Sequence, residues 1–106
     1  MKEYSVVITD KAQQDLRKIF EYIAFDLSSP NTAHEQLNRI EKAIQALNFF
    51  PHKYKKYEEK LWNSRNLHIL TVDNYCVFYI PDDIALRVTV IRIMYGGRNI
   101  KQVLQE

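Results

Sequence analysis

A cationic stretch near the end of the chain, Arg92 to Asn99, holds two arginines, a tyrosine and both of the glycines in the sequence. An arginine presents its donors as a planar fork that matches a phosphate or a carboxylate, and a neighbouring tyrosine adds one more donor. Such a set can bind phosphate, clamp the carboxylates of a partner, or tie a strand to a helix. For Arg92 the structural alternative is an ion pair with a helix carboxylate such as Asp15 or Glu21.

A second cationic set lies in residues 52–64, a segment without a clear hydrophobic period that we expect to be a loop. Its basic and aromatic residues are interleaved: Lys53, Tyr54, Lys55, Lys56 and Tyr57. Lysines can hold a nucleic-acid backbone while an aromatic ring stacks on a base. Two glutamates follow at once and lower the net charge, so the alternative is a solvated loop whose tyrosines pack on the core.

The remaining reactive residues lack the partners that catalysis or metal binding needs. The sequence has no glycine-rich phosphate loop, no nucleophile elbow and no paired-cysteine motif. Cys76 stands between Tyr75 and Val77 with no flanking charge to activate its thiol, which predicts a structural role. The three histidines have no metal-ligand spacing among themselves or with Cys76, so we expect neither a metal site nor a cofactor.

Length and composition indicate one cytoplasmic domain. The 106 residues are close to the commonest domain size, and we expect a single domain over residues 1–106. The net charge of +2 is too small to argue for nucleic-acid binding by itself. A single cysteine excludes an internal disulfide, which suits a reducing cytoplasm. No signal peptide and no apolar run of about 18 residues is present, so we expect no membrane association.

The first half of the chain predicts one strand and two helices. Residues 3–8 are short and β-branched, which is typical of a strand, and Asp10 with Gln13 has the spacing of a capping box that opens a helix. Two apolar stripes follow at helical spacing: Ala12, Leu16, Ile19, Ile23 and Leu27, and then Ala33, Leu37, Ile40, Ile44 and Leu47. Pro30 after Ser29 starts the second helix, and Pro51 ends it. The short link predicts an antiparallel hairpin of two helices, each about 18 residues long.

The second half predicts three strands and a final short helix. The strands cover residues 65–72, 75–80 and 86–95, with turns at 73–74 and 81–83, and the helix covers 99–104. The last strand is apolar on both faces, which indicates a central position in the sheet. Together these elements predict an α+β fold, β-α-α-β-β-β with a short C-terminal helix, in which an antiparallel helical hairpin packs on a mainly antiparallel sheet.

Strand alternation and the glycines place the candidate residues. Alternation along the last strand puts Arg92 and Met94 on one face and Ile91, Ile93 and Tyr95 on the other. On the preceding strand it puts three residues on one face: Cys76, Phe78 and Ile80. We expect Gly96 and Gly97 to use backbone angles that other residues resist. The chain then leaves the strand sharply, with Tyr95 and Arg98 at the rim of a groove.

Three motifs make the chain resemble a known family over essentially its whole length. They are Thr9-Asp10-x-Ala12-x-x-Asp15-Leu16-x-x-Ile19-x-x-Tyr22-Ile23, Asn74-Tyr75-x-Val77-Phe78-Tyr79, and Arg92-Ile93-x-Tyr95-Gly96-x-Arg98-Asn99. In this order they resemble the RelE/ParE superfamily of toxins from type II toxin–antitoxin operons. The superfamily holds two activities on one fold. RelE-like members cut mRNA on the ribosome without a metal, whereas ParE-like members poison DNA gyrase by binding it.

The resemblance is closer to the ParE-like branch. In the nucleases a catalytic arginine follows the tyrosine of the second meander strand, and Cys76, which cannot stabilise phosphate charge, stands there in this sequence. The apolar row that Cys76 begins suits a protein-binding surface better than a phosphate site. Arg98 matches the arginine at the end of the last strand in RNA-cleaving members. The tyrosine of their C-terminal segment has no counterpart after Asn99, and Tyr95 is no more than a candidate substitute.

The resemblance therefore predicts the toxin of a plasmid-stabilising toxin–antitoxin module, neutralised by a small antitoxin whose C-terminal segment wraps the groove between hairpin and sheet. Its expected target is DNA gyrase, which would make it a binding protein rather than an enzyme. Cleavage of ribosome-bound mRNA is the alternative, and a binding module without toxicity is a third reading. The residues expected to bind target or antitoxin are Arg98, Tyr95, Arg92, Cys76, Phe78, Ile80, Lys53 and Lys55. A nuclease would instead draw its catalytic residues from Arg98, Tyr95, His68 and Arg65, because some nuclease members rely on histidines.

Overall fold

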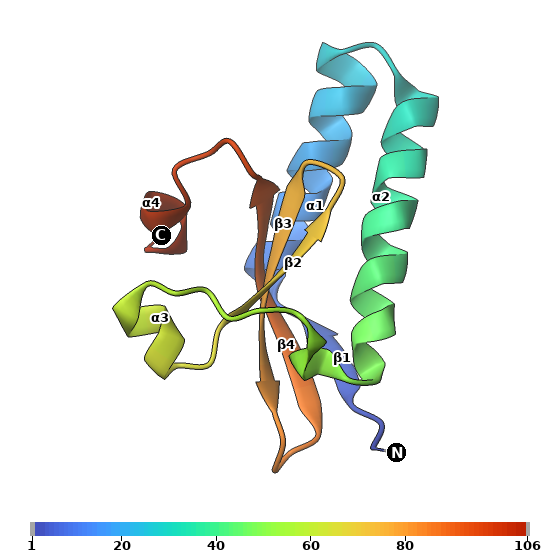
Figure 1. The fold of residues 1–106 in the computed structure, drawn as a ribbon. Coiled ribbons are helices and arrows are strands. Elements are labelled where there is room, and N and C mark those ends of the chain that lie inside the picture. Colours follow the sequence, from blue (N-terminus) through green and yellow to red (C-terminus); the bar gives the residue numbers. More distant parts are fainter. Residues whose placement is uncertain (1, 106) are drawn as a thin grey trace.

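The computed structural model describes residues 2–105 and has the α+β architecture that the sequence predicts (Figure 1). The strands are β1 (Ser5–Ile8), β2 (His68–Val72), β3 (Tyr75–Asp82) and β4 (Arg87–Tyr95). The helices are α1 (Asp10–Glu21), α2 (Pro30–Gln45), α3 (Lys60–Ser64) and α4 (Ile100–Leu104). Figure 1 shows α1 and α2 as a hairpin on one side of the sheet, with α3 and α4 on the other. None of the helices in this described range is long and apolar enough to cross a membrane.

The sheet order is β1-β4-β3-β2, so the apolar strand β4 is interior, as its composition predicts. β4 pairs with β3 and β3 with β2 in antiparallel fashion, whereas β1 runs parallel to β4. The two adjacent hairpin pairs and the single parallel pair agree with a mainly antiparallel sheet. The β2–β3 turn is the expected one, because Asp73 has a φ of 55°, a conformation that Asp tolerates.

A β-bulge in β4 corrects the strict alternation expected for that strand. Phe78 pairs with Arg92 and Tyr79 with Val90, so Ile91 is an extra residue without a partner in β3. A bulge of this kind resets which face the following side chains occupy. Ile91 consequently packs in the same cluster as Met94, on the α4 side, and not with Ile93 on the α1–α2 side.

The first helix begins one residue earlier than its sequence predicts and changes form at its end. Thr9 is the N-cap, with its Oγ1 accepting from the Ala12 N–H at 3.1 Å, and Asp10 is already helical. Gln13 donates to the Ile8 carbonyl instead of completing a capping box. After α1 the chain makes one π-helical turn, η1 (Tyr22–Asp26). The wider turn rotates the apolar stripe, and Leu27 is exposed instead of buried.

The second helix and its surroundings differ less from expectation. Pro30 occupies the first helical position as expected, while the Ser29 side chain makes no capping bond. Two short 3₁₀ turns, η2 (Ala46–Asn48) and η3 (Pro51–Lys53), follow α2. The segment expected to be a plain loop therefore contains η3, a bridge between Lys56 and His68, and α3. β2 correspondingly begins at His68 and not at residue 65.

The turn between β3 and β4 lies later than predicted. β3 continues through Pro81 to Asp82, and the turn covers residues 83–86. Proline is tolerated there because β2 begins at His68, opposite Tyr79, and does not extend alongside Pro81. No strand on that side of β3 therefore needs the N–H that proline lacks. Asp82 Oδ1 closes the turn by accepting from the backbone N–H groups of Ile84 and Ala85, both at 3.0 Å.

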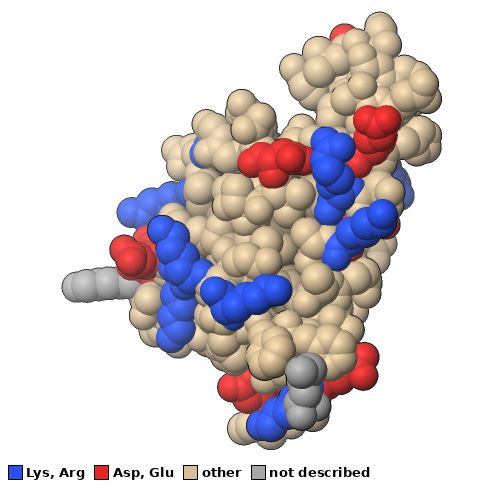
Figure 2. Space-filling model, turned by 45° about the vertical axis from the view of Figure 1, so that its right-hand side comes forward, with Lys and Arg blue, Asp and Glu red and all other residues tan. Residues whose placement is uncertain are grey.

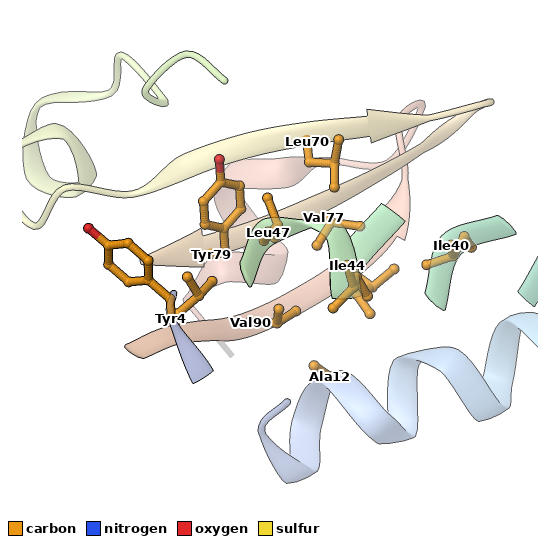
Figure 3. Packing of buried hydrophobic residues seen from close by; sticks show 11 residues of the cluster. Tyr4, Ala12, Ile40, Ile44, Leu47, Leu70, Val77, Tyr79 and Val90 are labelled. Carbon is orange, nitrogen blue, oxygen red and sulfur yellow. The ribbon is translucent and has the colours of Figure 1, made fainter. Parts of the chain in front are cut away.

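Two apolar clusters sandwich the sheet. The larger one lies between the helical hairpin and the sheet (Figure 3), and its fully buried members include Ile40, Ile44, Leu47, Val77, Tyr79, Val88 and Val90. The smaller one lies under α4 and contains Leu67, Phe78, Met94, Val103 and Leu104. Burial on both faces of β3 and β4 explains why these two strands lack a polar face.

Candidate binding groove

A groove of about 660 Å³ runs between the first helix and the Tyr95 end of the sheet. It is lined by Asp15, Lys18, Ile19, Tyr22, Ile23, Leu27, Tyr75, Ile93, Met94, Tyr95 and Arg98. Aliphatic side chains form much of this lining, and two cations and three phenols stand among them. The structure thus brings Tyr95 and Arg98 together at a groove between hairpin and sheet, where the sequence places them.

The three tyrosines of the groove come from three elements. The rings of Tyr75 and Tyr95 meet edge to face with centroids 5.8 Å apart. Burial, together with the nearby phenols of Tyr95 and Tyr22, raises the pKa of Tyr75. Its hydroxyl therefore stays protonated at neutral pH and can donate a hydrogen bond inside an otherwise apolar groove.

An internal ion pair supports one wall of the groove. Arg92 Nε and Nη2 donate to the two carboxylate oxygens of Asp15 at 2.8 and 3.0 Å, and Asp15 Oδ2 also accepts from the Ile93 N–H at 3.0 Å. Arg92 Nη1 donates to the Val103 carbonyl at 2.8 Å. The side chains of Arg92 and Asp15 are only 13% and 11% exposed. Arg92 thus connects β4 to α1 and α4, as expected if it forms an ion pair with a helix carboxylate. A direct contact of Arg92 with a partner stays a prediction.

The two glycines act through close packing and not through unusual backbone angles, which corrects the expectation for them. Neither Gly96 nor Gly97 has a positive φ. A Cβ on Gly96 would lie 3.3 Å from the Asn74 carbonyl oxygen, which accepts from the Gly96 N–H at 2.8 Å. A Cβ on Gly97 would lie 2.9 Å from the Tyr95 ring. The glycines therefore leave room for the Asn74 carbonyl and for the ring that stands at the groove.

Arg98 is an exposed cation at the rim of the groove. Its backbone N–H donates to the Tyr95 carbonyl at 3.1 Å, which fixes the turn, and its side chain is exposed. No carboxylate in the described range 2–105 lies within ion-pair distance of Arg98. Lys18 on α1 lines the same groove. The rim therefore offers positive charge to a ligand or partner.

The apolar row of β3, expected to form a binding face, packs largely under α4: Phe78 is buried, whereas Cys76 and Ile80 are half-buried. Cys76, Phe78 and Ile80 do share one face, in the cluster under α4. Phe78 is fully buried and meets the Tyr57 ring edge to face at 5.8 Å. Burial raises the pKa of the Cys76 thiol, which agrees with a structural cysteine. A role for this row in binding stays a prediction.

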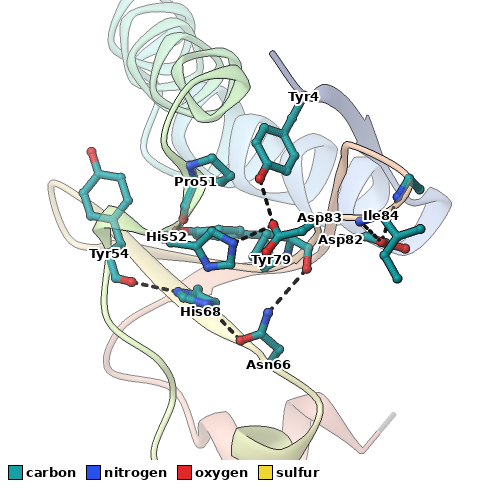
Figure 4. Close-up of polar contacts among 12 residues, drawn as sticks. Tyr4, Pro51, His52, Tyr54, Asn66, His68, Tyr79, Asp82, Asp83 and Ile84 are labelled. Atoms are coloured by element: carbon teal, nitrogen blue, oxygen red, sulfur yellow. Dashed lines mark hydrogen bonds and ion pairs between the residues drawn. The ribbon is translucent and has the colours of Figure 1, made fainter. Parts of the chain in front are cut away.

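His68 is a structural residue at the other end of the β2–β3 pair (Figure 4). It is 3% exposed, its Nδ1 lies 2.7 Å from the Tyr54 carbonyl, and its ring stacks on Tyr79 at 5.4 Å. Burial lowers the pKa of His68 and keeps it neutral at physiological pH. His68 pairs with Tyr79, whereas Tyr95 pairs with Tyr75, and these positions are about 13 Å apart along β3.

The other nuclease candidate, Arg65, and the expected binding residues Lys53 and Lys55 also lie apart from the groove. Arg65 lies over the Trp62 ring at 5.2 Å, and Lys53 lies over the Tyr54 ring at the same distance. Lys55 is exposed, and its carbonyl accepts from the Ile69 N–H. The structure thus joins Tyr95 with Arg98 but does not gather His68 or Arg65 around them.

The sequence did not point to Lys18, Tyr22 or Tyr75 as groove residues. Tyr75 appeared only as part of the β3 motif, and Lys18 looked like an ordinary solvent-facing lysine of the first helix. Tyr22 falls off the apolar stripe and turns toward the groove where the π-helical turn begins. Such a turn is not readable from hydrophobic spacing, although π-helical turns are frequent at functional sites.

Comparisons with known proteins agree with the fold. The family model described as the ParE toxin of the type II toxin–antitoxin system parDE matches residues 6–100. Among solved structures, the chromosomal ParDE system of P. aeruginosa contains a chain of the same fold, with a TM-score of 0.72 and 17% identity over 88% of this chain and 96% of that one. No curated protein matches the chain significantly.

Two further solved structures share the fold. One is the toxin–antitoxin complex RelBE2 of Mycobacterium tuberculosis, with a TM-score of 0.64 and 21% identity over 92% of this chain and 97% of that one. The other is a double mutant of the E. coli toxin RelE in the free state, with a TM-score of 0.68 and 14% identity over 98% of this chain and 93% of that one. At these identities the likeness concerns the fold.

Proposed function

The chain belongs to the ParE toxin family of type II toxin–antitoxin systems, whose model matches residues 6–100, and from this premise we propose that it inhibits growth by binding DNA gyrase. A small antitoxin encoded beside it neutralises this activity, and the pair stabilises the plasmid or chromosome segment that carries it. The observation that carries the proposal is the groove itself. It joins an apolar lining to an unpaired Arg98, and it lacks a gathered set of catalytic groups among the described residues.

The groove fits a segment of another polypeptide. Tyr22, Leu27 and Tyr95, each at least half exposed, offer apolar contact, while Arg98 and Lys18 offer charge to carboxylates. A chain that orders on binding gains specificity from such a combination of apolar anchors and rim charges. Two of the structurally similar proteins are toxin–antitoxin assemblies, ParDE and RelBE2, which supports an antitoxin as a partner of this groove.

Gyrase is favoured over mRNA by the chemistry that RNA cleavage would need. A metal-free nuclease must deprotonate the 2′-hydroxyl, protonate the leaving oxygen and stabilise the phosphorane charge. Tyr95 and Arg98 stand together and are the observation in favour of cleavage. Cys76 occupies the position where nucleases of the superfamily carry an arginine, and His68 is buried and neutral. The groove thus offers two cations, Lys18 and Arg98, but its described lining has no carboxylate or histidine free to act as a base, because Asp15 is bound by Arg92.

The test is a gyrase cleavage assay with the purified protein, gyrase, ATP and supercoiled plasmid. We expect linear DNA covalently trapped on gyrase, and less trapping with Arg98→Ala or Tyr95→Ala. Arg65→Ala is the matched control, because Arg65 lies on Trp62 away from the groove, and it should trap DNA as the wild type does. Absence of both trapping and inhibition of supercoiling at micromolar protein would rule out gyrase.

The mRNA alternative has its own readout. RNA ends mapped after induction in growing cells would show new cuts within translated codons if the protein is a ribosome-dependent nuclease. Cuts that vanish in the double variant Arg98→Ala/Tyr95→Phe would assign the chemistry to the groove rim. Cuts that persist in that variant would place a nuclease site elsewhere. No effect of induction on growth would favour a binding module without toxicity.

A further inference from the structure

A second cleft, separate from the groove, lies where the start of the chain meets the link after α2. It has a volume of about 590 Å³ and is lined by Lys2, Tyr4, Phe50, Pro51, His52 and Lys53. It shares no lining residue with the groove at Tyr95 and Arg98. Figure 4 shows Tyr4 and His52 converging on Asp83 beside Pro51. A cleft of this volume is in the range that holds a small organic ligand.

Phe50 is held in a backbone conformation that phenylalanine resists. Its φ is 54° and its ψ is 53°, in the left-handed region, which is a genuine outlier for a bulky residue. Five described residues other than glycine have positive φ: Ser28, Phe50, Asn66, Asp73 and Leu86. Asn and Asp tolerate this region, and Leu86 packs against the core. Phe50 is different, because it is bulky and 61% of the residue is exposed.

Burial of the Phe50 ring therefore does not account for the strained backbone angles of this residue. Strained backbone persists where the surrounding structure imposes it, and such residues cluster at sites of function. Pro51, buried directly after Phe50, begins the η3 turn and fixes the direction of the chain there. The result is an aromatic ring presented to solvent at the edge of a cleft.

Two of the residues that line the cleft are cationic, Lys2 and Lys53. Neither lies within ion-pair distance of a carboxylate in the described part of the chain, although Lys2 acts electrostatically on Asp83 and Lys53 lies over the Tyr54 ring. Asp83 accepts from Tyr4 Oη and lies against His52 Nε2, both at 2.7 Å. These bonds, that of His52 first, lower the pKa of Asp83. Asp83 is thus committed to holding Tyr4 and His52 in place.

Further lysines extend the positive surface. Lys55 and Lys56 follow Lys53 and are exposed. Figure 2 shows several Lys and Arg side chains on one face of the molecule, with Asp and Glu side chains among them. An exposed ring beside cations that have no ion-pair partner among the described residues is an arrangement with which proteins bind single nucleotides of a strand. The ring stacks on a base, which gives sequence-tolerant affinity, and the cations contact the phosphate.

We propose that this cleft binds one nucleotide unit, with its base stacked on Phe50 and its phosphate between Lys2 and Lys53. His52, oriented by Asp83, offers its second ring nitrogen as a hydrogen-bonding edge for the base or sugar. The nucleotide can be free or can be part of a single strand, because both carry the same base and phosphate. The proposal does not rest on gyrase, on mRNA cleavage or on an antitoxin.

The experiment measures binding by the full-length protein at low ionic strength. The first probe is a fluorescein-labelled oligodeoxythymidylate followed by anisotropy, and the second is AMP added as a competitor. We expect the oligonucleotide to bind and Phe50→Ala to weaken its affinity about tenfold, the effect of losing one base-stacking contact. Phe50→Tyr should retain most of the affinity, because it keeps the ring. Competition by AMP would assign the cleft to free nucleotides, and lack of competition would assign it to a strand; either supports the proposal.

Charge variants test the phosphate contacts. Lys2→Glu/Lys53→Glu should weaken binding and reduce the dependence of affinity on salt, because two phosphate-contacting cations are lost. Lys101→Glu is the control for each single reversal, Lys2→Glu or Lys53→Glu, because it changes the net charge by the same amount. It lies on α4, on the other side of the sheet, and should leave the affinity close to that of the wild type. The proposal is overturned if neither probe binds, or if Phe50→Ala and the double lysine variant bind as the wild type does.

A further variant separates the role of the ring from the integrity of the fold. Glycine accepts a positive φ without strain, and the Phe50 ring is mostly exposed. Phe50→Gly should therefore keep or raise the Tm and still lose the affinity for the oligonucleotide. Retained affinity in Phe50→Gly would show that the ring does not bind the base, and the proposal would fall.

Discussion

Arg92 and Arg98 belong to one cationic stretch and yet have opposite surroundings. Arg92 is nearly buried, and its guanidinium donates hydrogen bonds to Asp15 and to the Val103 carbonyl. Arg98 is exposed and lies outside ion-pair distance of every described carboxylate. The difference follows from position, because Arg92 precedes the end of β4 and faces packed elements, whereas Arg98 follows the glycine turn. One arginine maintains the groove and the other is presented by it.

This division predicts a large stability cost for Asp15→Asn. The substitution leaves the Arg92 guanidinium nearly buried without its counter-charge, and breaking a buried pair from one side costs about 3 kcal/mol or more. The measurement is urea denaturation of the variant and the wild type. Asp73→Asn is the matched control, because the Arg39–Asp73 pair is about half exposed, at 52% and 44%, and Asn tolerates the positive φ of that position.

We expect Asp73→Asn to change the free energy of unfolding far less than Asp15→Asn. Exposed pairs contribute little because water screens them. Equal losses in the two variants would mean that the Asp15–Arg92 pair behaves as a surface pair, and the support that it gives to the groove wall would have to come from another contact.

At the scale of the elements, the glycine turn after β4 predicts different outcomes for two similar substitutions. Gly96→Ala brings a methyl group against the Asn74 carbonyl, which is fixed by its hydrogen bond to the Gly96 N–H. Gly97→Ala brings one against the Tyr95 ring, which is exposed and able to rotate away. Replacing glycine also stabilises by restricting the unfolded chain, by about 0.5 kcal/mol where the fold accepts the new residue.

Gly97→Ala should therefore be neutral or slightly stabilising, and Gly96→Ala should be the less stable of the two by about 1 kcal/mol, as for a forced contact in a packed site. Thermal denaturation followed by circular dichroism measures both. A lower Tm for Gly97→Ala than for Gly96→Ala would show that the Tyr95 ring cannot rotate away and that the β3 end can adjust its backbone. In that case the groove would be more rigid at its rim than at its base.

The elements also show how far the sequence determines the fold. Apolar spacing predicted the order of strands and helices, because burial of one stripe or one face is a local property of each element. The cap at Thr9 and the bulge at Ile91 were missed because each depends on a single hydrogen-bond choice. The π-helical turn at Tyr22 was missed because the apolar residues of the sequence keep α-helical spacing up to Leu27, which the turn leaves exposed.

The site was predictable only where local sequence determines contact. Tyr95 and Arg98 are close in the chain, so their meeting at the rim followed from the strand end. Lys18 and Tyr75 join them through packing of α1 on the sheet, which no local pattern specifies. The apolar row at Phe78 was assigned to an open face, because the sequence does not tell which face α4 covers.

At the scale of the molecule, two sites lie at separate places with no shared lining residue. The groove presents Arg98 and Lys18 beside aliphatic side chains, and the cleft presents Phe50 with Lys2 and Lys53. If the antitoxin neutralises the protein by occupying the groove, its affinity depends on the rim cations of the groove and not on those of the cleft. Complementary rim charge contributes to both association rate and specificity.

We therefore expect Arg98→Glu/Lys18→Glu to weaken the affinity for the antitoxin encoded beside the gene by about tenfold or more, with a salt dependence smaller than that of the wild type. Lys2→Glu/Lys53→Glu changes net charge by the same amount and should bind the antitoxin nearly as the wild type does. Isothermal titration of both variants, with their Tm values as the control for folding, makes the comparison. The two double variants change the net charge by the same amount, so only a local contact can make their antitoxin affinities differ. Equal weakening of the affinity by both would therefore mean that net charge, and not the groove, recruits the antitoxin.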